Sequence, residues 1–136
     1  MHLGFTGTQT GMSSKQKQEL ALLLEHFRDE DAIDEELTVF HHGDCIGADE
    51  EAHKIAVLLG LIIVVHPPIN SSKRAFCEEG TLKEPLPYLE RNRAIVNECE
   101  VLFAAPKSDI EVLRSGTWST YRYAKKLKKQ VYLLER

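Results

Sequence analysis

The sequence predicts an α/β fold, a three-layer Rossmann-like domain with about five parallel strands and helices on both faces of the sheet. Short β-type runs alternate along the chain with segments whose apolar residues repeat at helical spacing, an order typical of βαβ units with parallel strands. The 136 residues, 43% of them hydrophobic, are close to the commonest size of one domain. We therefore expect one domain over residues 1–136.

The first strand and helix are predicted over the opening quarter of the chain. Residues 2–6, His-Leu-Gly-Phe-Thr, form a short β-type run, and Ser13 with Gln16 three positions later is the pattern of a helix capping box. The apolar stripe of the helix that follows consists of Leu20, Leu23, Leu24 and Phe27. The acidic, turn-like residues 29–36 are expected to end this helix.

The next three elements follow at short intervals. Residues 37–40 are a second short strand, and residues 48–59 a second helix, with Gly60 where a helix C-terminus favours glycine. Residues 61–65 are continuously apolar, as a strand covered on both faces would be.

The second half contains a long irregular segment. Residues 66–88 hold four of the five prolines, and loops of this length inside a compact domain are uncommon and often functional. We expect this loop to lie over the carboxyl ends of the strands. After it, the pattern predicts a short helix over 89–97, a strand over 101–105, a helix over 117–129 and a strand over 130–134.

Composition excludes several classes of protein. A net charge of −4 argues against a general DNA coat, and few aromatic residues are available to stack on bases, so a nucleic-acid partner is expected to be unlikely. No apolar run approaches the ~20 residues that a membrane helix needs, so no membrane partner is expected. Three cysteines without a C-x-x-C pair argue against a disulfide scaffold or a structural zinc site. With no signal-peptide pattern at the N-terminus, a cytoplasmic location is the expectation.

The candidate site lies where the predicted strands end, because ligands of such sheets bind outside the carboxyl ends of the strands. Five of the eight glycines fall in the segments after these strands: Gly7, Gly11, Gly43, Gly47 and Gly116. Three of the segments lead into helix N-termini, where backbone N–H groups and the helix dipole favour an anion. A phosphate or nucleotide site is therefore predicted, the alternative being that these glycines only make tight turns.

Two well-known phosphate motifs are absent. The glycine spacing fits neither the G-x-G-x-x-G fingerprint nor the G-x-x-x-x-G-K-[ST] loop, which disfavours ordinary NAD dehydrogenases and ATPases.

Residues 42–49, His-Gly-Asp-Cys-Ile-Gly-Ala-Asp, are the most distinctive segment. Asp49 and Asp44 are candidates to accept ribose hydroxyls or to act as base or nucleophile, and Asp49 could instead only complement the helix dipole. Cys45, near a helix N-terminus, is a weaker nucleophile candidate through a lowered pKa. A metal is suggested by His41, His42, Asp44 and Cys45. Because neighbouring residues on a strand point to opposite faces, the two histidines are not expected to share one ion, and no metal is predicted.

Further candidates lie in the second half of the chain. Arg91, Asn92 and Arg93 offer two guanidinium groups for a phosphate or carboxylate, the alternative being a surface ion pair. Trp118 is a candidate to stack on a base, with a half-buried core position as the alternative.

Together, residues 42–49, Arg91-Asn92-Arg93 and residues 116–120 resemble, in order, the motifs of the SLOG superfamily, most closely its YspA/YpsA-related branch. The resemblance implies a Rossmann-like fold that binds a nucleotide or nucleotide-derived ligand as sensor or sequestering module, with no further cofactor. It places Gly43, Gly47 and Asp49 on the ribose-phosphate. The other ligand-binding positions that it implies are Gly7, Thr8, Gln9, Thr10, Gly11, Arg91, Asn92, Arg93, Ser115, Gly116 and Thr117. Related folds often dimerise, so a homo-oligomer is also expected.

One departure separates the chain from the LOG phosphoribohydrolases of that superfamily. Thr120 stands where their catalytic glutamate would be, and it cannot do the work of a carboxylate. Binding is therefore favoured over catalysis. The alternative is hydrolysis of an N-glycosidic bond with Asp49, or second Asp44, in place of the glutamate. Single-stranded DNA binding, known in the DNA-processing protein A domain of the superfamily, ranks third.

Overall fold

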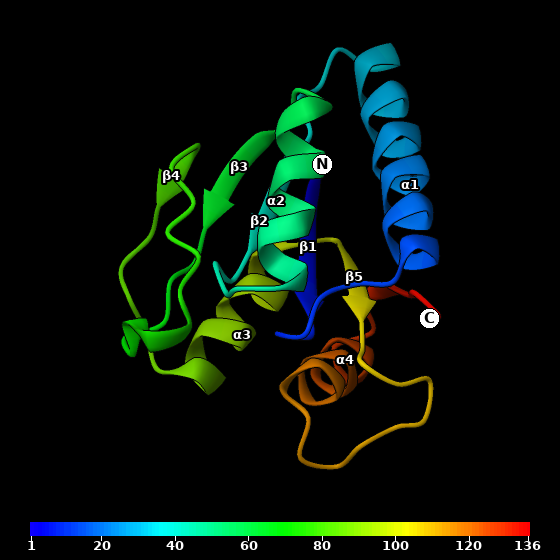
Figure 1. Cartoon of the computed structure of the whole chain (residues 1–136). Helices are drawn as coiled ribbons and strands as arrows, with labels where there is room; N and C mark the ends of the chain where they lie inside the picture. Colours follow the sequence, from blue (N-terminus) through cyan, green and yellow to red (C-terminus); the bar gives the residue numbers. More distant parts are fainter.

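The computed structural model describes residues 1–136 as an α/β fold around one six-stranded sheet (Figure 1). All strand pairs are parallel, and the strand order is β4-β3-β2-β1-β5-β6. The elements are β1 His2–Gly7, α1 Ser14–Ile33, β2 Val39–His42, α2 Ala48–Leu58, β3 Ile62–Val65, the 3-10 turn η1 Ser71–Lys73, β4 Thr81–Leu82, α3 Tyr88–Glu98, β5 Val101–Ala105, α4 Gly116–Lys126 and β6 Gln130–Leu133. The predicted fold class is confirmed.

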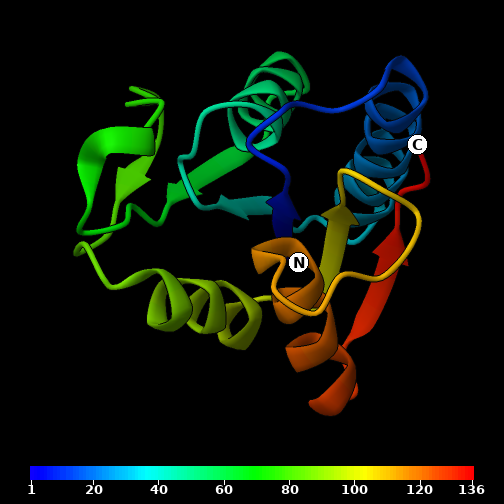
Figure 2. The same ribbon diagram turned by 60° about the horizontal axis from the view of Figure 1, so that its bottom comes forward.

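Helices cover both faces of the sheet, which gives the predicted three layers. Figure 2 shows α1 and α2 on one side of the strands and α3 and α4 on the other. The larger core cluster joins α1 and α2 to the sheet through side chains such as Leu20, Phe5 and Phe103. A smaller cluster lies on the opposite face and consists of Ile95, Val96, Cys99, Leu102 and Ala124.

The N-terminal elements form for the reasons that the sequence indicates. The side chain of Ser13 accepts a hydrogen bond from the Gln16 amide, and the Gln16 side chain accepts one from the Ser13 amide, so the capping box is complete. Helix α1 nevertheless extends through the expected acidic terminator to Ile33. Asp31 is buried there and its Oδ2 accepts hydrogen bonds from the Met1 amino group and from Thr38 Oγ1, at 3.2 and 2.5 Å.

Three strands differ from the prediction. Strand β2 begins two residues late, which places His41 and His42 in the sheet rather than in the loop after it. Strand β4 was not predicted, because Thr81 and Leu82 are both exposed and lie within the proline-rich segment. Strand β3 is less covered than expected, since Ile62 is 42% exposed.

The chain order of the strands reverses between β1 and β5, which creates a topological switch point at their carboxyl ends. Ligands of open parallel sheets bind outside such a point. No helix of the structure combines the length and apolar character that crossing a membrane requires.

Candidate functional site

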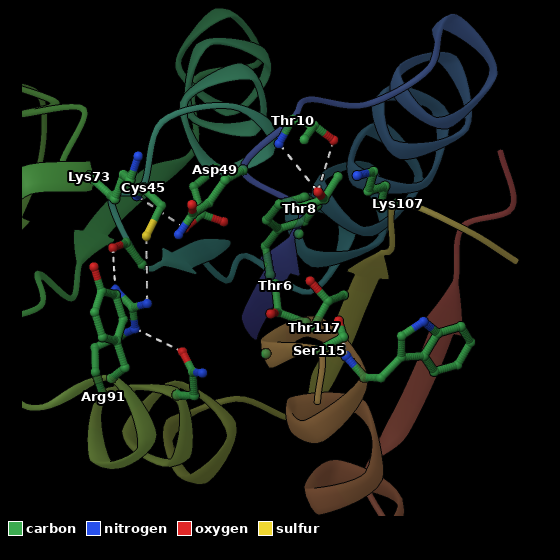
Figure 3. Close-up of a pocket in the computed structure, with 18 of the residues that line it drawn as sticks. Thr6, Thr8, Thr10, Cys45, Asp49, Lys73, Arg91, Lys107, Ser115 and Thr117 are labelled. Carbon is green, nitrogen blue, oxygen red and sulfur yellow. Dashed lines mark hydrogen bonds between the residues drawn. The ribbon is translucent and has the colours of Figure 1, made fainter. Parts of the chain in front are cut away.

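A cavity of about 700 Å³ lies at the carboxyl ends of β1 and β5 (Figure 3). It is bordered by the loops after β1, β2 and β5, by the start of α3, and by part of the long segment after β3. The predicted residues that line it are Gly7, Thr8, Gln9, Thr10, Gly43, Asp49, Arg91, Asn92, Ser115, Gly116, Thr117 and Trp118. The structure therefore brings most of the candidate residues to one place.

The N-terminus of α4 forms one wall of the cavity. Ser115 caps the helix, because its Oγ accepts a hydrogen bond from the Trp118 amide at 3.3 Å. Gly116 and Thr117 begin the first turn, whose amides have no acceptor within the helix. Lys107, on the loop that precedes α4, brings a cation to the same cavity (Figure 3). This wall has the donors and the positive charge that suit an anion.

The loop after β1 is held against the N-terminus of α2. Thr8 Oγ1 accepts a hydrogen bond from the Thr10 amide at 3.2 Å, and the Thr8 carbonyl accepts one from the Ala48 amide at 3.0 Å. Gly47 does not line the cavity, but it permits this packing. Its φ is +86°, and a Cβ added to it would lie 2.2 Å from the Gln9 carbonyl oxygen.

Asp49 is the only carboxylate that lines the cavity, and it is almost fully buried. Its Oδ2 accepts a hydrogen bond from the Cys45 amide at 3.2 Å, while its buried Oδ1 has no hydrogen-bond partner. Burial raises the pKa of this carboxyl to about 6, and the positive charge of Arg91 opposes that rise. The carboxyl group therefore titrates about one pH unit below neutral. Its Oδ1 remains a hydrogen-bond acceptor without a donor.

Arg91 is buried at the opposite side of the cavity from Thr8 (Figure 3). Its Nη1 donates to the carbonyl oxygens of Gly43 and His66, the latter at 3.1 Å, and its Nε donates to Asn92 Oδ1 at 2.8 Å. Gly43 leaves room for this guanidinium, because a Cβ on it would lie 2.7 Å from the Arg91 side chain. Arg91 is therefore a fixed cation built into the cavity wall.

Four predicted residues do not line the cavity. Asp44 is completely buried in an ion pair with Arg74, and Gly11 and Gly47 lie behind the loops that they shape. Arg93 points elsewhere, with its guanidinium 5.2 Å from the centre of the Tyr123 ring. Asp44 thus holds the structure together at a place where we had expected a reacting group.

Two expectations about single residues are corrected. The pKa of the Cys45 thiol is raised by burial and by the nearby Asp49 carboxylate, so the expected lowering at a helix N-terminus does not occur. Trp118 is only 4% exposed and its ring packs edge-on against Tyr121, which leaves little surface for a base.

The sequence reasoning placed the long segment over this edge of the sheet but did not identify the residues that it supplies, and it missed Tyr88. Asn70, Ser72 and Lys73 of η1 line the cavity, and Tyr88, at the start of α3, presents a 36% exposed ring there. No local pattern marks these residues, because they reach the cavity through contacts between distant segments. Thr120, in the position of the family glutamate, donates its hydroxyl to the Gly116 carbonyl and does not line this cavity.

Comparison with family models and with curated protein sequences finds no match. Solved structures share the fold. A molybdenum cofactor binding protein from Rippkaea orientalis superposes with a TM-score of 0.70 at 20% identity, over 97% of this chain and 74% of that one. The single-stranded DNA binding DNA processing protein A of Helicobacter pylori gives 0.69 at 19%, over 98% and 64%. The molybdenum cofactor carrier protein of Chlamydomonas reinhardtii gives 0.61 at 18%, over 98% and 75%.

These neighbours agree with the resemblance to the SLOG superfamily at the level of the fold. They also correct one expectation. We had taken a nucleic-acid partner to be unlikely from the acidic composition and the few aromatic residues. That inference is wrong as a rule for this fold, since the Helicobacter protein with the same architecture binds single-stranded DNA. The chain spans a little under two thirds of that protein.

Proposed function

We propose that this chain binds a nucleotide or nucleotide-derived ligand in the cavity, as a sensor or sequestering module. The observation that carries the proposal is the placement of an open helix N-terminus, at Gly116 and Thr117, within one cavity with the cations Lys73, Arg91 and Lys107. The volume of about 700 Å³ lies within the ~300–1,000 Å³ typical of small-molecule sites.

The charge of the cavity favours an anionic ligand. Three cations line it against the single carboxylate of Asp49, although the chain as a whole carries −4. We place the phosphate at the start of α4, where the free amides and Lys107 meet. Tyr88 is the exposed aromatic side chain of the lining that offers a face to a base.

Asp49 supports a ligand that also has hydroxyl groups. Its Oδ1 is buried without a partner, an arrangement that costs free energy in the empty protein. A sugar hydroxyl would remove that cost by donating to this oxygen once the side chain had turned it toward the cavity.

Hydrolysis of an N-glycosidic bond is the less favoured alternative. Asp49, with its pKa raised to about 6, has suitable properties for a general acid or base. Glycosidases, however, generally use two carboxyl groups on either side of the bond, and Asp49 has no second carboxylate in the cavity. The observed side chains therefore suit binding better than turnover.

The test is native mass spectrometry of the full chain with nucleoside monophosphates, NAD and ADP-ribose, paired with thermal denaturation. A ligand at 100 times its Kd should add ~2.7 kcal/mol and raise Tm by several degrees. Lys107→Ala and Asp49→Asn should weaken binding, whereas Lys54→Ala, an exposed lysine of α2, should not. Release of free base, lost in Asp49→Asn, would show an enzyme. No adduct and no Tm shift with any compound would refute the proposal.

Binding of single-stranded nucleic acid is a second candidate, favoured by one further observation. A hollow of about 210 Å³ adjoins the main cavity through Asn92, and three cations line it: Arg93, Arg122 and Lys126. A polyanion could extend from the cavity across this surface. Titration with a labelled oligonucleotide at several salt concentrations tests it, because phosphate contacts give an affinity that falls steeply with salt. Loss of affinity in Arg122→Ala, without loss of mononucleotide binding, would identify this surface.

A further inference from the structure

His41 and His42 point to opposite faces of the sheet, and each meets a different group of side chains. His41 lies on the α3 side, where His66 and Glu98 converge on it. His42 lies on the α2 side, where it contacts His53. The sequence argument that these neighbours do not share an ion is consistent with this arrangement, but it did not consider the distant residues that each histidine meets.

The group around His41 is a triangle. His41 Nδ1 and His66 Nε2 are 2.9 Å apart, His66 Nε2 and Glu98 Oε2 are 3.2 Å apart, and His41 Nδ1 and Glu98 Oε2 are 3.5 Å apart. A hydrogen on His66 Nε2 can point to only one of its two neighbours. Hydrogen bonds therefore cannot satisfy all three sides at once.

The group around His42 is a chain instead. His42 Nδ1 accepts from the Asp44 amide, so its hydrogen is on Nε2, which donates to His53 Nδ1 at 2.9 Å. His53 Nε2 then donates to Glu79 at 2.6 Å. Every nitrogen has one partner, and hydrogen bonds alone account for this arrangement. The contrast marks the triangle as the unusual group.

We propose that His41, His66 and Glu98 form a binding site for a divalent transition metal, with Zn²⁺ as the ion best suited to two imidazoles and a carboxylate. Ligands at the usual ~2.0–2.1 Å from tetrahedral Zn²⁺ stand about 3.3 Å from one another, close to the three observed separations. Three protein ligands leave one coordination position open. This site lies apart from the cavity and does not depend on the proposed nucleotide ligand.

The surroundings also suit a metal. The other ring nitrogen of His41, Nε2, is 2.8 Å from His2 Nδ1. Histidines that bind a metal usually make such a second contact, which fixes the orientation of the ring. Lys83 lies 3.4 Å from the outer oxygen of Glu98, Oε1, and leaves Oε2 to the histidines.

The ion would link α3 to the paired strands β2 and β3. His41 is on β2, His66 follows β3, and Glu98 ends α3. The His66 carbonyl accepts a hydrogen bond from Arg91, so the site lies directly behind one of the groups that fix the cavity wall. Glu98 is 39% exposed, which gives the ion a route of entry and places the open position near solvent.

The test is titration of the chelator-treated full chain with Zn²⁺ and, for its visible spectrum, Co²⁺. One equivalent should bind and raise Tm, and Glu98→Gln and His66→Gln should each weaken binding at least about 10-fold. Glu98→Gln alters a half-exposed side chain and should fold normally. His53→Gln, in the neighbouring chain of histidines, is the matched control and should bind as the wild type does.

The opposite results would overturn the site. These are failure to bind either ion, unchanged affinity in Glu98→Gln, or weakening by His53→Gln. A thiolate-to-Co²⁺ band would also overturn it, because that band would place the metal on Cys77 beside His42 and His53. Nucleotide binding measured in parallel distinguishes this outcome from failure of the proposed function.

Discussion

Asp44 and Arg74, thirty residues apart, form an ion pair in which Arg74 Nε donates to Asp44 Oδ2 at 2.6 Å. The same carboxylate accepts a hydrogen bond from the Cys77 amide through Oδ1, and the Asp44 carbonyl accepts one from the Ala75 amide. The segment after β3 is thus fixed to the loop after β2 by one completely buried aspartate. Because that segment brings Lys73 to the cavity, Asp44 acts on the candidate site indirectly.

Replacing Asp44 should therefore destabilise the protein rather than remove a reacting group. Breaking a buried ion pair by removing one partner typically costs about 3 kcal/mol or more, and Asp44→Ala should lower the free energy of unfolding by that amount in urea denaturation. Asp34→Ala, at an exposed aspartate, should change it by less than about 0.5 kcal/mol. Equal stability of the two variants would contradict this assignment.

The raised pKa of Asp49 should appear as a pH dependence of stability. Its folded-state pKa of about 6 exceeds the ordinary 3.8, so the stabilising contribution of the neutral form is complete below about pH 4 and is lost as pH rises through 6. Two pKa units correspond to about 3 kcal/mol. Asp49→Asn should match the wild type at pH 4 and exceed it in unfolding free energy at pH 7. A difference that does not change with pH would show an unshifted carboxyl.

Two glycines that both have a positive φ should respond differently to alanine. Gly47 and Gly60 have φ of +86° and +76°, but only Gly47 would bring a Cβ against the Gln9 backbone. Gly60→Ala should cost about 1 kcal/mol for the left-handed conformation. Gly47→Ala should cost at least about 2 kcal/mol more through overpacking and should weaken ligand binding. Chemical denaturation and the ligand titration measure both effects, and equal costs would show that the loop after β1 yields freely.

The three cysteines should react slowly with a thiol reagent at neutral pH. Burial raises the pKa of all three thiols, to about 12 for Cys77 and about 11 for Cys99, so little thiolate is present. In the folded protein, reaction with a disulfide reagent followed by absorbance should be slow, and in urea all three should react quickly. Fast modification of Cys45 in the folded state would restore it as a candidate nucleophile.

The parts of the fold that local sequence determines were predictable. The Ser13–Gln16 capping box, Gly60 after α2 and the apolar run of β5 each depend on residues close together in the chain. Strand β4 was missed because its two residues are exposed and form a strand only by pairing with β3. The bounds of β2 were misjudged because the histidines are buried by partners that the sequence alone does not reveal.

The location of the candidate site was predictable, but the roles of its individual residues were not. Rules for parallel sheets placed Thr8, Asp49 and Gly116 at one edge, where the structure has them. They gave no means of separating Asp49, which lines the cavity, from Asp44, which pairs with Arg74. That difference depends on Arg74, which lies thirty residues away. The same distant segment contributes Lys73, which the sequence could not place in the cavity.

The segment between β3 and α3 also bears on how this scaffold can acquire new ligands. Neither hydrophobic core cluster includes a residue between Val65 and Ile95, yet this stretch supplies Asn70, Ser72 and Lys73 to the cavity. Residues 69–76 of this stretch, none of them buried, can therefore be exchanged without repacking the interior, provided that the contacts of Asp44 are kept. Recognition can diversify in this wall while the architecture remains unchanged, and a grafted segment that retained Arg74 would be the natural starting point for redesign.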